Sequence, residues 1–190
     1  PFLNEISRVF KGIEFRFMRG TAQEVIEFMK KGEDELGLAA MRSDDWDRLD
    51  AWPLFEEPFD LAVSSDHPLA RGTTVQLAQL KGQRFLRRTY CEYAEQIGDA
   101  LRGSAGEIIG QHEISSEHDL MKLTGTGIGI SILPKSAATG SETKRIAIED
   151  LGFSRTVYLF GIAGRQRSAI AATMAKLLRA ADWRKITPYA

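Results

Sequence analysis

Cysteine is almost absent from this chain of 190 residues, which contains a single one, Cys91. One thiol cannot form an internal disulfide, and its count fits a reducing compartment, so we expect a cytoplasmic protein. The sequence also lacks the run of about 18 apolar residues that a membrane-spanning helix needs. No basic segment followed by an apolar core opens the chain, so no signal peptide is visible. It begins at Pro1 rather than at methionine, and we expect it to be part of a longer protein.

An excess of charge of either sign is missing too. The 25 basic and 26 acidic side chains leave a formal net charge of −1, which gives no overall electrostatic footprint for nucleic acid. Hydrophobic residues make up 43% and charged residues 27%, the composition of a folded globular protein. A length of 190 residues allows one domain or two small lobes. We therefore expect a folded protein that does not bind DNA through this part of its sequence.

A nucleotide-binding loop is absent, although Gly125, Gly127 and Gly129 alternate in the stretch GTGIGISILP. A dinucleotide-binding loop has the order strand, G-x-G-x-x-G, helix, so that free N–H groups of the helix face the phosphates. Here a predicted helix precedes the glycines, a predicted strand follows them, and the spacing is G-x-G-x-G. We expect Gly125 to end the helix in a left-handed conformation and the other two to let the chain turn into a buried strand. No cofactor is expected.

Catalytic and metal-binding patterns are also missing, since the chain has neither a G-x-S-x-G nor a Walker A sequence. The segment His112–Asp119 holds two histidines, but His112 is predicted in a strand and His118 in the helix that follows. They lack the spacing of H-E-x-x-H, so we interpret them as solvated side chains rather than as zinc ligands. Cys91 has no histidine near it in sequence and is interpreted as a packing residue. We expect no metal and no enzymatic activity.

Hydrophobic periodicity predicts alternating helices and strands from the start of the chain. Leu3–Lys11 has the apolar spacing of a helix, and Ile13–Arg19 alternates as a strand does. Thr21 begins the next helix with a capping box, and Gly32 is expected to end it. The apolar strand Leu36–Met41 completes an α-β-α-β order, which is typical of an open sheet with crossover helices.

The same alternation continues along the rest of the chain. Further strands are predicted at Leu49–Phe55, Phe59–Ser64, Phe85–Leu86, Ile128–Ile132, Ile146–Ile148 and Val157–Ile162. Another predicted strand ends at Ile114. Further helices are predicted at Val75–Leu80, Tyr90–Leu101, from Ser116 to about Thr124 and from Ser168 to about Trp183.

The segment Arg84–Tyr90 mixes basic and aromatic side chains, a combination found in nucleic-acid-binding sites. The segment is short, however, and the charge around it is balanced. A strand is predicted to end here and a helix to start, with Thr89 near its N-cap, which would offer N–H donors and guanidinium groups to a small anion. We favour a small anion over nucleic acid as the ligand of this segment.

Four stretches, in their order and spacing, resemble the effector-binding domain of LysR-type transcriptional regulators over about residues 1–183. They are Gly20-Thr21 with the helix to Gly32 and the strand Leu36–Ala39, then Pro53–Val63 with His67–Ala70, then Val75–Phe85, and finally Gly127–Pro134. The chain departs from the family pattern at Asp34 and Glu35, where the family usually has an apolar residue and then aspartate.

This resemblance implies a two-lobed α/β fold like that of type 2 periplasmic binding proteins, in which each lobe is an open mixed sheet with flanking helices. Lobe I is expected to comprise residues 1–62 and 146–190, and lobe II residues 63–145. The family's winged helix-turn-helix DNA-binding domain and the first strand of its sensor domain are absent from this sequence. The resemblance also implies a homodimer or homotetramer, in which the first helix and strand pack against Tyr90–Leu101 of a partner.

The resemblance further places a small effector, which we expect to be anionic, in the cleft between the lobes. The expected effector-binding residues are Thr21, Arg88, Thr89 and Ser116, whose hydroxyl, N–H and guanidinium groups suit a carboxylate. Plain N-capping by Thr21 and Ser116, and a solvated charge on Arg88, stay open as alternatives.

The full-length protein is then expected to bind DNA through the absent domain and to contact RNA polymerase, with no role for a membrane. A solute-binding protein of a transport system, with the same lobes, is the alternative function. An enzyme on this scaffold would need convergent acid, base or nucleophile groups, and none stands at a specific spacing.

Overall fold

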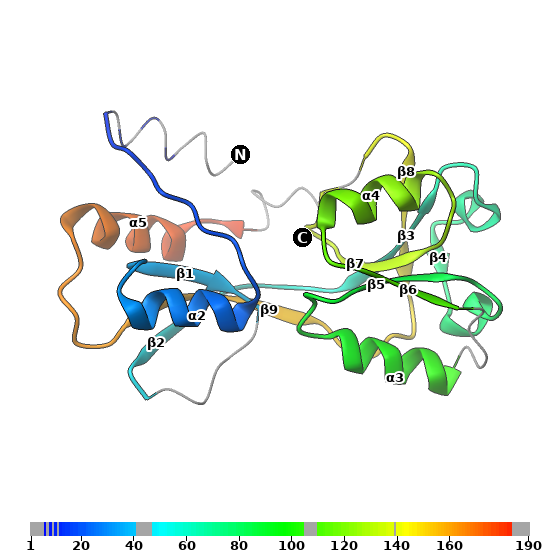
Figure 1. Cartoon of the computed structure of the whole chain (residues 1–190), viewed down its shortest axis with the longest axis horizontal. Helices are drawn as coiled ribbons and strands as arrows, with labels where there is room; N and C mark the ends of the chain where they lie inside the picture. Colours follow the sequence, from blue (N-terminus) through cyan, green and yellow to red (C-terminus); the bar gives the residue numbers. More distant parts are fainter. Residues whose placement is uncertain are drawn as a thin grey trace. The chain divides into compact units, whose positions relative to one another are not determined.

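The computed structural model describes residues 6, 8 and 10 and residues 12–40, 47–104, 110–138 and 140–183. The chain forms two compact units, whose helices and strands are labelled in Figure 1. The first unit comprises Pro1–Glu56 and Arg155–Ala190, and the second comprises Glu57–Ser154. No helix in the described ranges combines the length and the apolar composition that crossing a membrane requires.

The first unit is built on a three-stranded sheet. Its strands β1 (Leu36–Ala39), β9 (Arg155–Ile162) and β2 (Leu49–Glu57) stand in the order β1-β9-β2. The first two pair antiparallel, with Leu36 opposite Gly161. The long middle strand comes from the end of the chain, so the predicted return of the tail to the first unit is what closes this sheet.

Two helices cover the two faces of this sheet. Leu159 and Phe160 are neighbours in β9 and therefore point to opposite faces. Phe160 packs with Met29 of helix α2 (Ala22–Lys31), whereas Leu159 packs with Ala175 and Leu178 of helix α5 (Ala169–Ala180). The helices form because one stripe of each is apolar, and Thr21 and Ser168 cap their N-termini.

The second unit contains two sheets. Strands β4 (Thr74–Val75), β8 (Thr143–Ile148), β3 (Phe59–Ser64) and β7 (Ser131–Pro134) stand in the order β4-β8-β3-β7, and β5 (Phe85–Arg88) pairs in parallel with β6 (Gln111–Ile114). Ile130 joins the sheets, because its carbonyl accepts from the Leu86 N–H and its own N–H donates to the Arg84 carbonyl, both at 2.8 Å.

The core of the second unit lies on both faces of these sheets. Every residue of β3 is buried, as expected for a central strand with both faces covered. Helix α3 (Ala94–Ser104) contributes Leu101 to the cluster that contains Phe85, and helix α4 (Glu117–Gly125) contributes Leu120 to the cluster that contains Leu86. Short 3-10 helices, Pro68–Arg71 and Leu77–Leu80, connect the strands.

The structure confirms most predicted elements, including the helices that follow Thr21, Ser116 and Ser168. Three predictions were wrong. Residues 13–19, all of which are described, form no strand. Val75–Leu80 does not form the predicted helix, because Val75 ends strand β4 and Leu77–Leu80 is a 3-10 helix. The helix predicted from Tyr90 begins at Ala94 instead. The predicted helix at Leu3–Lys11, and the dimer contact proposed for it, lie mostly outside the described residues.

The glycine-rich stretch ends a helix and leads into a strand, as predicted, with one correction. Gly125 is the last residue of α4, and the left-handed residue is Gly127, with φ of 75°. Gly129 allows a close approach, because a Cβ there would lie 2.8 Å from the carbonyl oxygen of Arg84. The glycines therefore shape a helix end and a strand crossing.

The unit boundaries differ from those expected at residues 62/63 and 145/146. The structure divides the chain after Glu56 and after Ser154. Strands β3 and β8 pair antiparallel, with Asp60 opposite Ala147, so the hydrogen-bonded ladder keeps both strands in the second unit. Sequence periodicity locates a strand but does not reveal the strand with which it pairs. The predicted boundaries therefore differ from those of the structure.

Candidate ligand site at the ends of two parallel strands

Three of the four predicted site residues lie at one edge of the second unit. Strands β5 and β6 are parallel neighbours, and Arg88 stands opposite Ile114 at their carboxyl ends. The Thr89 N–H donates to the Ile114 carbonyl at 3.1 Å. Ile114 precedes Ser116 by two residues in the sequence, so this bond joins Thr89 to the segment that leads to Ser116. Ligand sites of open α/β sheets form at such strand ends. The structure thus brings Arg88, Thr89 and Ser116 together.

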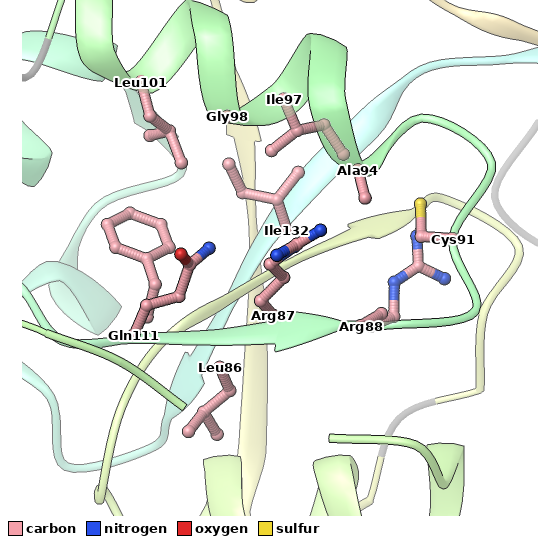
Figure 2. A pocket seen from close by; sticks show the side chains of 11 residues that line it. Leu86, Arg87, Arg88, Cys91, Ala94, Ile97, Gly98, Leu101, Gln111 and Ile132 are labelled. Atoms are coloured by element: carbon pink, nitrogen blue, oxygen red, sulfur yellow. The ribbon is translucent and has the colours of Figure 1, made fainter. Parts of the chain in front are cut away.

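Arg88 is the buried charged group at this edge, with only 7% of it exposed. Its Nη2 donates to the Sγ of Cys91 at 2.9 Å, and its Cζ lies 5.6 Å from the centre of the Tyr90 ring. Figure 2 shows Arg88 and Cys91 side by side. In the part of the chain that the structure describes, no carboxylate pairs with Arg88, whereas neighbouring Arg87 pairs with Glu113 at 2.9 Å.

Tyr90 and Cys91 complete the surroundings of Arg88. Tyr90 belongs to the segment predicted to bind an anion but was not named as a site residue, and Cys91 was interpreted as a packing residue. Burial raises the pKa of the Tyr90 phenol above its ordinary value, and the charge of Arg88 opposes that rise. The phenol is therefore neutral at physiological pH. The sequence assigned both residues to a helix that begins only at Ala94, so the turn that brings them back onto Arg88 was not visible.

A small cavity separates this edge from helix α3. It is lined by Arg88, Cys91, Ile97, Leu101 and Ile132 among others, and Figure 2 shows their side chains. Its volume is about 30 Å³, far below the roughly 300–1,000 Å³ of a usual ligand pocket. Thr89, which directly follows β5 at this edge, is exposed.

Ser116 is the N-cap of α4, as predicted. Its Oγ accepts from the Asp119 N–H at 3.3 Å, and its own hydroxyl proton can still be donated to a ligand. The first turn of α4 also carries Glu117 and Asp119, whose charges already complement the helix dipole. This helix end is therefore acidic, and Arg88 is the buried positive charge at the same edge of the unit.

Thr21 belongs to the other unit, where it caps α2. Its N–H donates to Glu24 Oε2 at 2.7 Å, its Oγ1 donates to the same oxygen at 3.0 Å, and the Glu24 N–H donates to Oγ1 at 3.3 Å. The two bonds to the carboxylate, the backbone one above all, hold the pKa of Glu24 below its ordinary value. The single hydroxyl proton of Thr21 is thus already donated within the capping box.

Replacing Thr21 with alanine is expected to lower the free energy of unfolding of the first unit by about 1 kcal/mol, the usual cost of a lost N-cap. The lowered pKa of Glu24 means that its share of this stabilisation is present above the unfolded pKa of glutamate and is lost as the pH falls through the folded pKa. Urea unfolding at pH 7 and at about pH 3 should therefore show a smaller cost in acid. Thr21→Ser should retain wild-type stability, and an equal cost at both pH values would contradict the coupling.

The two histidines of the segment His112–Asp119 lie on different elements, as the sequence predicted. His112 in β6 and His118 in α4 are both exposed. Within the described ranges, no group of three or more histidine, cysteine and acidic side chains is arranged to hold a metal ion.

Sequence comparison relates the chain to transcription regulators. A sequence profile of the LysR substrate binding domain matches residues 1–183. The chain is 25% identical over 134 residues to a hydrogen peroxide-inducible genes activator of Dickeya chrysanthemi, covering 70% of this chain and 43% of that protein. It is 34% identical over 95 residues to the transcriptional dual regulator OxyR of Escherichia coli K12, covering 49% of this chain and 30% of that protein. It therefore spans less than half the length of these relatives.

Solved structures share the fold. The CcmR regulatory domain of Synechocystis PCC6803, solved in complex with 2-PG, has a TM-score of 0.78 and 23% identity, covering 94% of this chain and 88% of that chain. The effector binding domain of QuiR, solved in complex with shikimate, has a TM-score of 0.72 and 18% identity, covering 93% and 86%. The two-lobed α/β fold like that of type 2 periplasmic binding proteins, expected from the sequence, is confirmed.

Proposed function

The chain belongs to the LysR substrate binding domain family, and from that premise we propose that it is the ligand-sensing part of a bacterial transcription regulator whose effector is a small anion bound beside Arg88. The relatives reported above are transcription regulators, and two of the solved domains carry a small molecule. A carboxylate or a phosphate is the chemistry that a guanidinium recognises best.

The observation that carries the choice of an anion is the environment of Arg88. Arginine side chains that are largely removed from water normally have an acidic partner, as Arg145 has in Asp60 at 3.8 Å and Arg167 has in Asp50 at 3.1 Å. Arg88 is more buried than either, and among the described residues its contacts are a sulfur and an aromatic ring. A buried guanidinium without a counter-ion is costly, and a bound anion would supply the missing charge.

The neighbouring hydroxyls would complete the site. Thr89 Oγ1 lies 3.4 Å from the Ile114 carbonyl, a long contact that a better acceptor would replace. Ser116 would donate its hydroxyl proton while still capping α4. Thr21, from the first unit, is the least suited of the four residues, because an effector would have to displace Glu24 from its hydroxyl.

For the full-length protein we propose that effector binding changes the arrangement of a homodimer or homotetramer, and that a DNA-binding domain outside this chain reads the operator. The ligand acts by binding one arrangement more tightly than another. Contacts with RNA polymerase and a place in the cytoplasm belong to the same proposal, since such a regulator acts where the chromosome is transcribed.

A thermal-shift screen of small carboxylates and phosphates against the full-length protein tests the proposal. A ligand at 100 times its dissociation constant stabilises the protein by about 2.7 kcal/mol, which raises the melting temperature measurably. Arg88→Ala should abolish the shift, and Arg88→Lys should retain only part of it because lysine cannot form a bidentate pair. Arg87→Ala is the matched control, because Arg87 is the adjacent arginine and already has Glu113 as its partner.

Two results would overturn the proposed anion site. One is a neutral amide of the best acid that stabilises the protein equally well, and the other is an Arg88→Ala variant that keeps the full shift. DNA binding by residues 1–190 without the rest of the protein would count against the assignment of this chain as the sensing part.

A further inference from the structure

Cys91 lies against the buried charge of the candidate site. Its Sγ accepts a hydrogen bond from Nη2 of Arg88 at 2.9 Å, and Figure 2 shows the two side chains next to each other. A cysteine that serves only in packing is usually among the most buried residues of a protein, whereas Cys91 is partly exposed. Its contact and its accessibility therefore point to a chemical role, which the interpretation of Cys91 as a packing residue left out.

Arg88 supplies the second observation, because it lacks an acidic partner among the described residues. It is 7% exposed, and its contacts there are the Cys91 sulfur and the Tyr90 ring. Burial raises the pKa of the Tyr90 phenol, so the ring is neutral at physiological pH. Of these two neighbours, the thiol is the one that can ionise close to neutral pH. A thiolate would give the buried guanidinium the counter-ion that it otherwise lacks.

We expect the other charged side chains of this edge to act on the thiol more weakly than Arg88 does. They are Arg87 of β5, Glu92 and Glu95 at the start of α3, Glu113 of β6 and Glu117 of α4. Arg87 and Glu113 pair with each other at 2.9 Å. The remaining carboxylates, which oppose ionisation of the thiol, are half-buried or exposed and are screened by water. A guanidinium that contacts the sulfur and is largely removed from water acts more strongly than they do.

The backbone around Cys91 adds to this effect. The Cys91 carbonyl accepts from the Ala94 N–H at 3.1 Å, so Cys91 stands just before the first turn of α3, at the positive end of the helix dipole. An adjacent arginine and a helix N-terminus are two of the environments that lower the pH at which a cysteine ionises. Cys91 has both, and its side chain is still accessible to a reagent.

We propose that Cys91 is a thiolate in the effector-free protein, where it serves as the counter-ion of Arg88, and that it is a site of covalent modification by carbon electrophiles. Small α,β-unsaturated carbonyl compounds are the chemical class that fits. The sulfur forms a bond to the β-carbon, the π electrons move onto the carbonyl oxygen, and the resulting enolate takes a proton from water. This addition needs neither an oxidant nor a second thiol, and Cys91 is the single cysteine of these 190 residues.

Effector binding and modification would then compete, a consequence that rests on the proposed function. A carboxylate or phosphate that takes over the guanidinium leaves the thiolate without its partner. The sulfur then takes up a proton, and a protonated thiol is a poor nucleophile. A bound anion should therefore protect Cys91 from electrophiles, although it does not cover the sulfur itself.

Alkylation of the effector-free full-length protein by iodoacetamide, followed by mass spectrometry of the peptide that contains Cys91, tests the proposal. An ordinary thiol ionises at about pH 8.5, so at pH 6.5 it reacts at about 1% of its plateau rate. We expect Cys91 to react at pH 6.5 at about half of its plateau rate or more. Arg88→Ala should lower that fraction about tenfold. Arg87→Ala is the matched control and should leave it unchanged, because Arg87 pairs with Glu113.

The class of electrophile is tested in the same way with N-ethylmaleimide, an α,β-unsaturated carbonyl compound. It should add to Cys91 at pH 6.5 in the wild-type protein and about tenfold more slowly in Arg88→Ala. If Arg88→Ala fails to fold, Arg88→Met takes its place, since methionine keeps much of the side-chain volume without the charge. A wild-type rate that keeps rising up to about pH 8.5 would refute the thiolate, and a wild-type profile in the variant would refute its pairing with Arg88.

These outcomes do not depend on an effector, so they are distinguishable from failure of the proposed anion site, which the thermal-shift screen decides. Sulfate links the two experiments, because its charge does not change in this pH range. At constant ionic strength, sulfate should slow the alkylation of Cys91 at pH 6.5. Sulfate that stabilises the protein through Arg88 but leaves the alkylation rate unchanged would show that the thiolate and the anion do not share the guanidinium, which contradicts the competition.

Discussion

Replacing Phe160 with alanine is expected to destabilise the first unit by about 3–5 kcal/mol, the usual cost of truncating a buried phenylalanine. Phe160 is 0% exposed and lies in the middle strand β9, where it packs with Met29 of α2 and with Tyr158. The truncation leaves a cavity between the sheet and the helix. Since a domain is stabilised by only about 5–15 kcal/mol, the first unit would lose a large part of its stability.

The effect should be confined to the first unit, because each of the four hydrophobic clusters draws its residues from one unit alone. Phe59→Ala is the reciprocal variant: Phe59 is 1% exposed, lies in β3, and contacts the rings of Tyr93 and Phe153. Hydrogen exchange should show β1 and β9 losing protection in Phe160→Ala, and β3 and β8 losing it in Phe59→Ala. Equal loss in both units in either variant would show that they unfold as one.

The fold was predictable from the sequence where local pattern and long-range packing agree. The capping box at Thr21, the buried run of β3 and the apolar stripe of α5 each specify an element by themselves. Periodicity does not identify strand partners, which is why Ile146–Ile148 was assigned to the wrong side of the boundary. Residues 13–19 show the same limit, because an alternating pattern forms a strand only where the segment actually pairs with another strand.

The candidate site was predictable in part, for a similar reason. The sequence placed Arg88, Thr89 and Ser116 where strands end and helices begin, and the parallel pair β5 and β6 brings these positions to one edge. Their role in binding stays a prediction. The contacts that surround the Arg88 guanidinium come from a turn, in which Cys91 and Tyr90 fold back onto it. The sequence suggested a helix at those positions, so a charge that is buried without an acidic partner could be recognised only in three dimensions.

The adjacent residues Glu56 and Glu57 also show that the sequence alone does not reveal which charged side chain is buried. Both stand in the stretch Pro53–Val63 that carries the family resemblance, and nothing in the sequence separates them. In the structure Glu56 is exposed, whereas Glu57 is 1% exposed. The Glu57 carboxylate accepts from the Ser136 N–H at 2.6 Å and from the Ser136 hydroxyl at 3.0 Å, which ties the start of β3 to the residues after β7.

Glu57→Ala is therefore expected to lower the free energy of unfolding of the second unit by about 3 kcal/mol, because it removes two hydrogen bonds to a charged group and leaves the Ser136 N–H without its acceptor. Glu57→Gln keeps one carbonyl oxygen and should cost roughly half as much. Glu56→Ala, the same substitution one residue earlier on an exposed side chain, should change stability by less than about 0.5 kcal/mol. Urea unfolding of the three variants measures these changes in the free energy of unfolding, and hydrogen exchange at the Ser136 amide serves as a local probe. Similar costs for Glu56→Ala and Glu57→Ala would mean that the buried carboxylate contributes no more to stability than a surface charge.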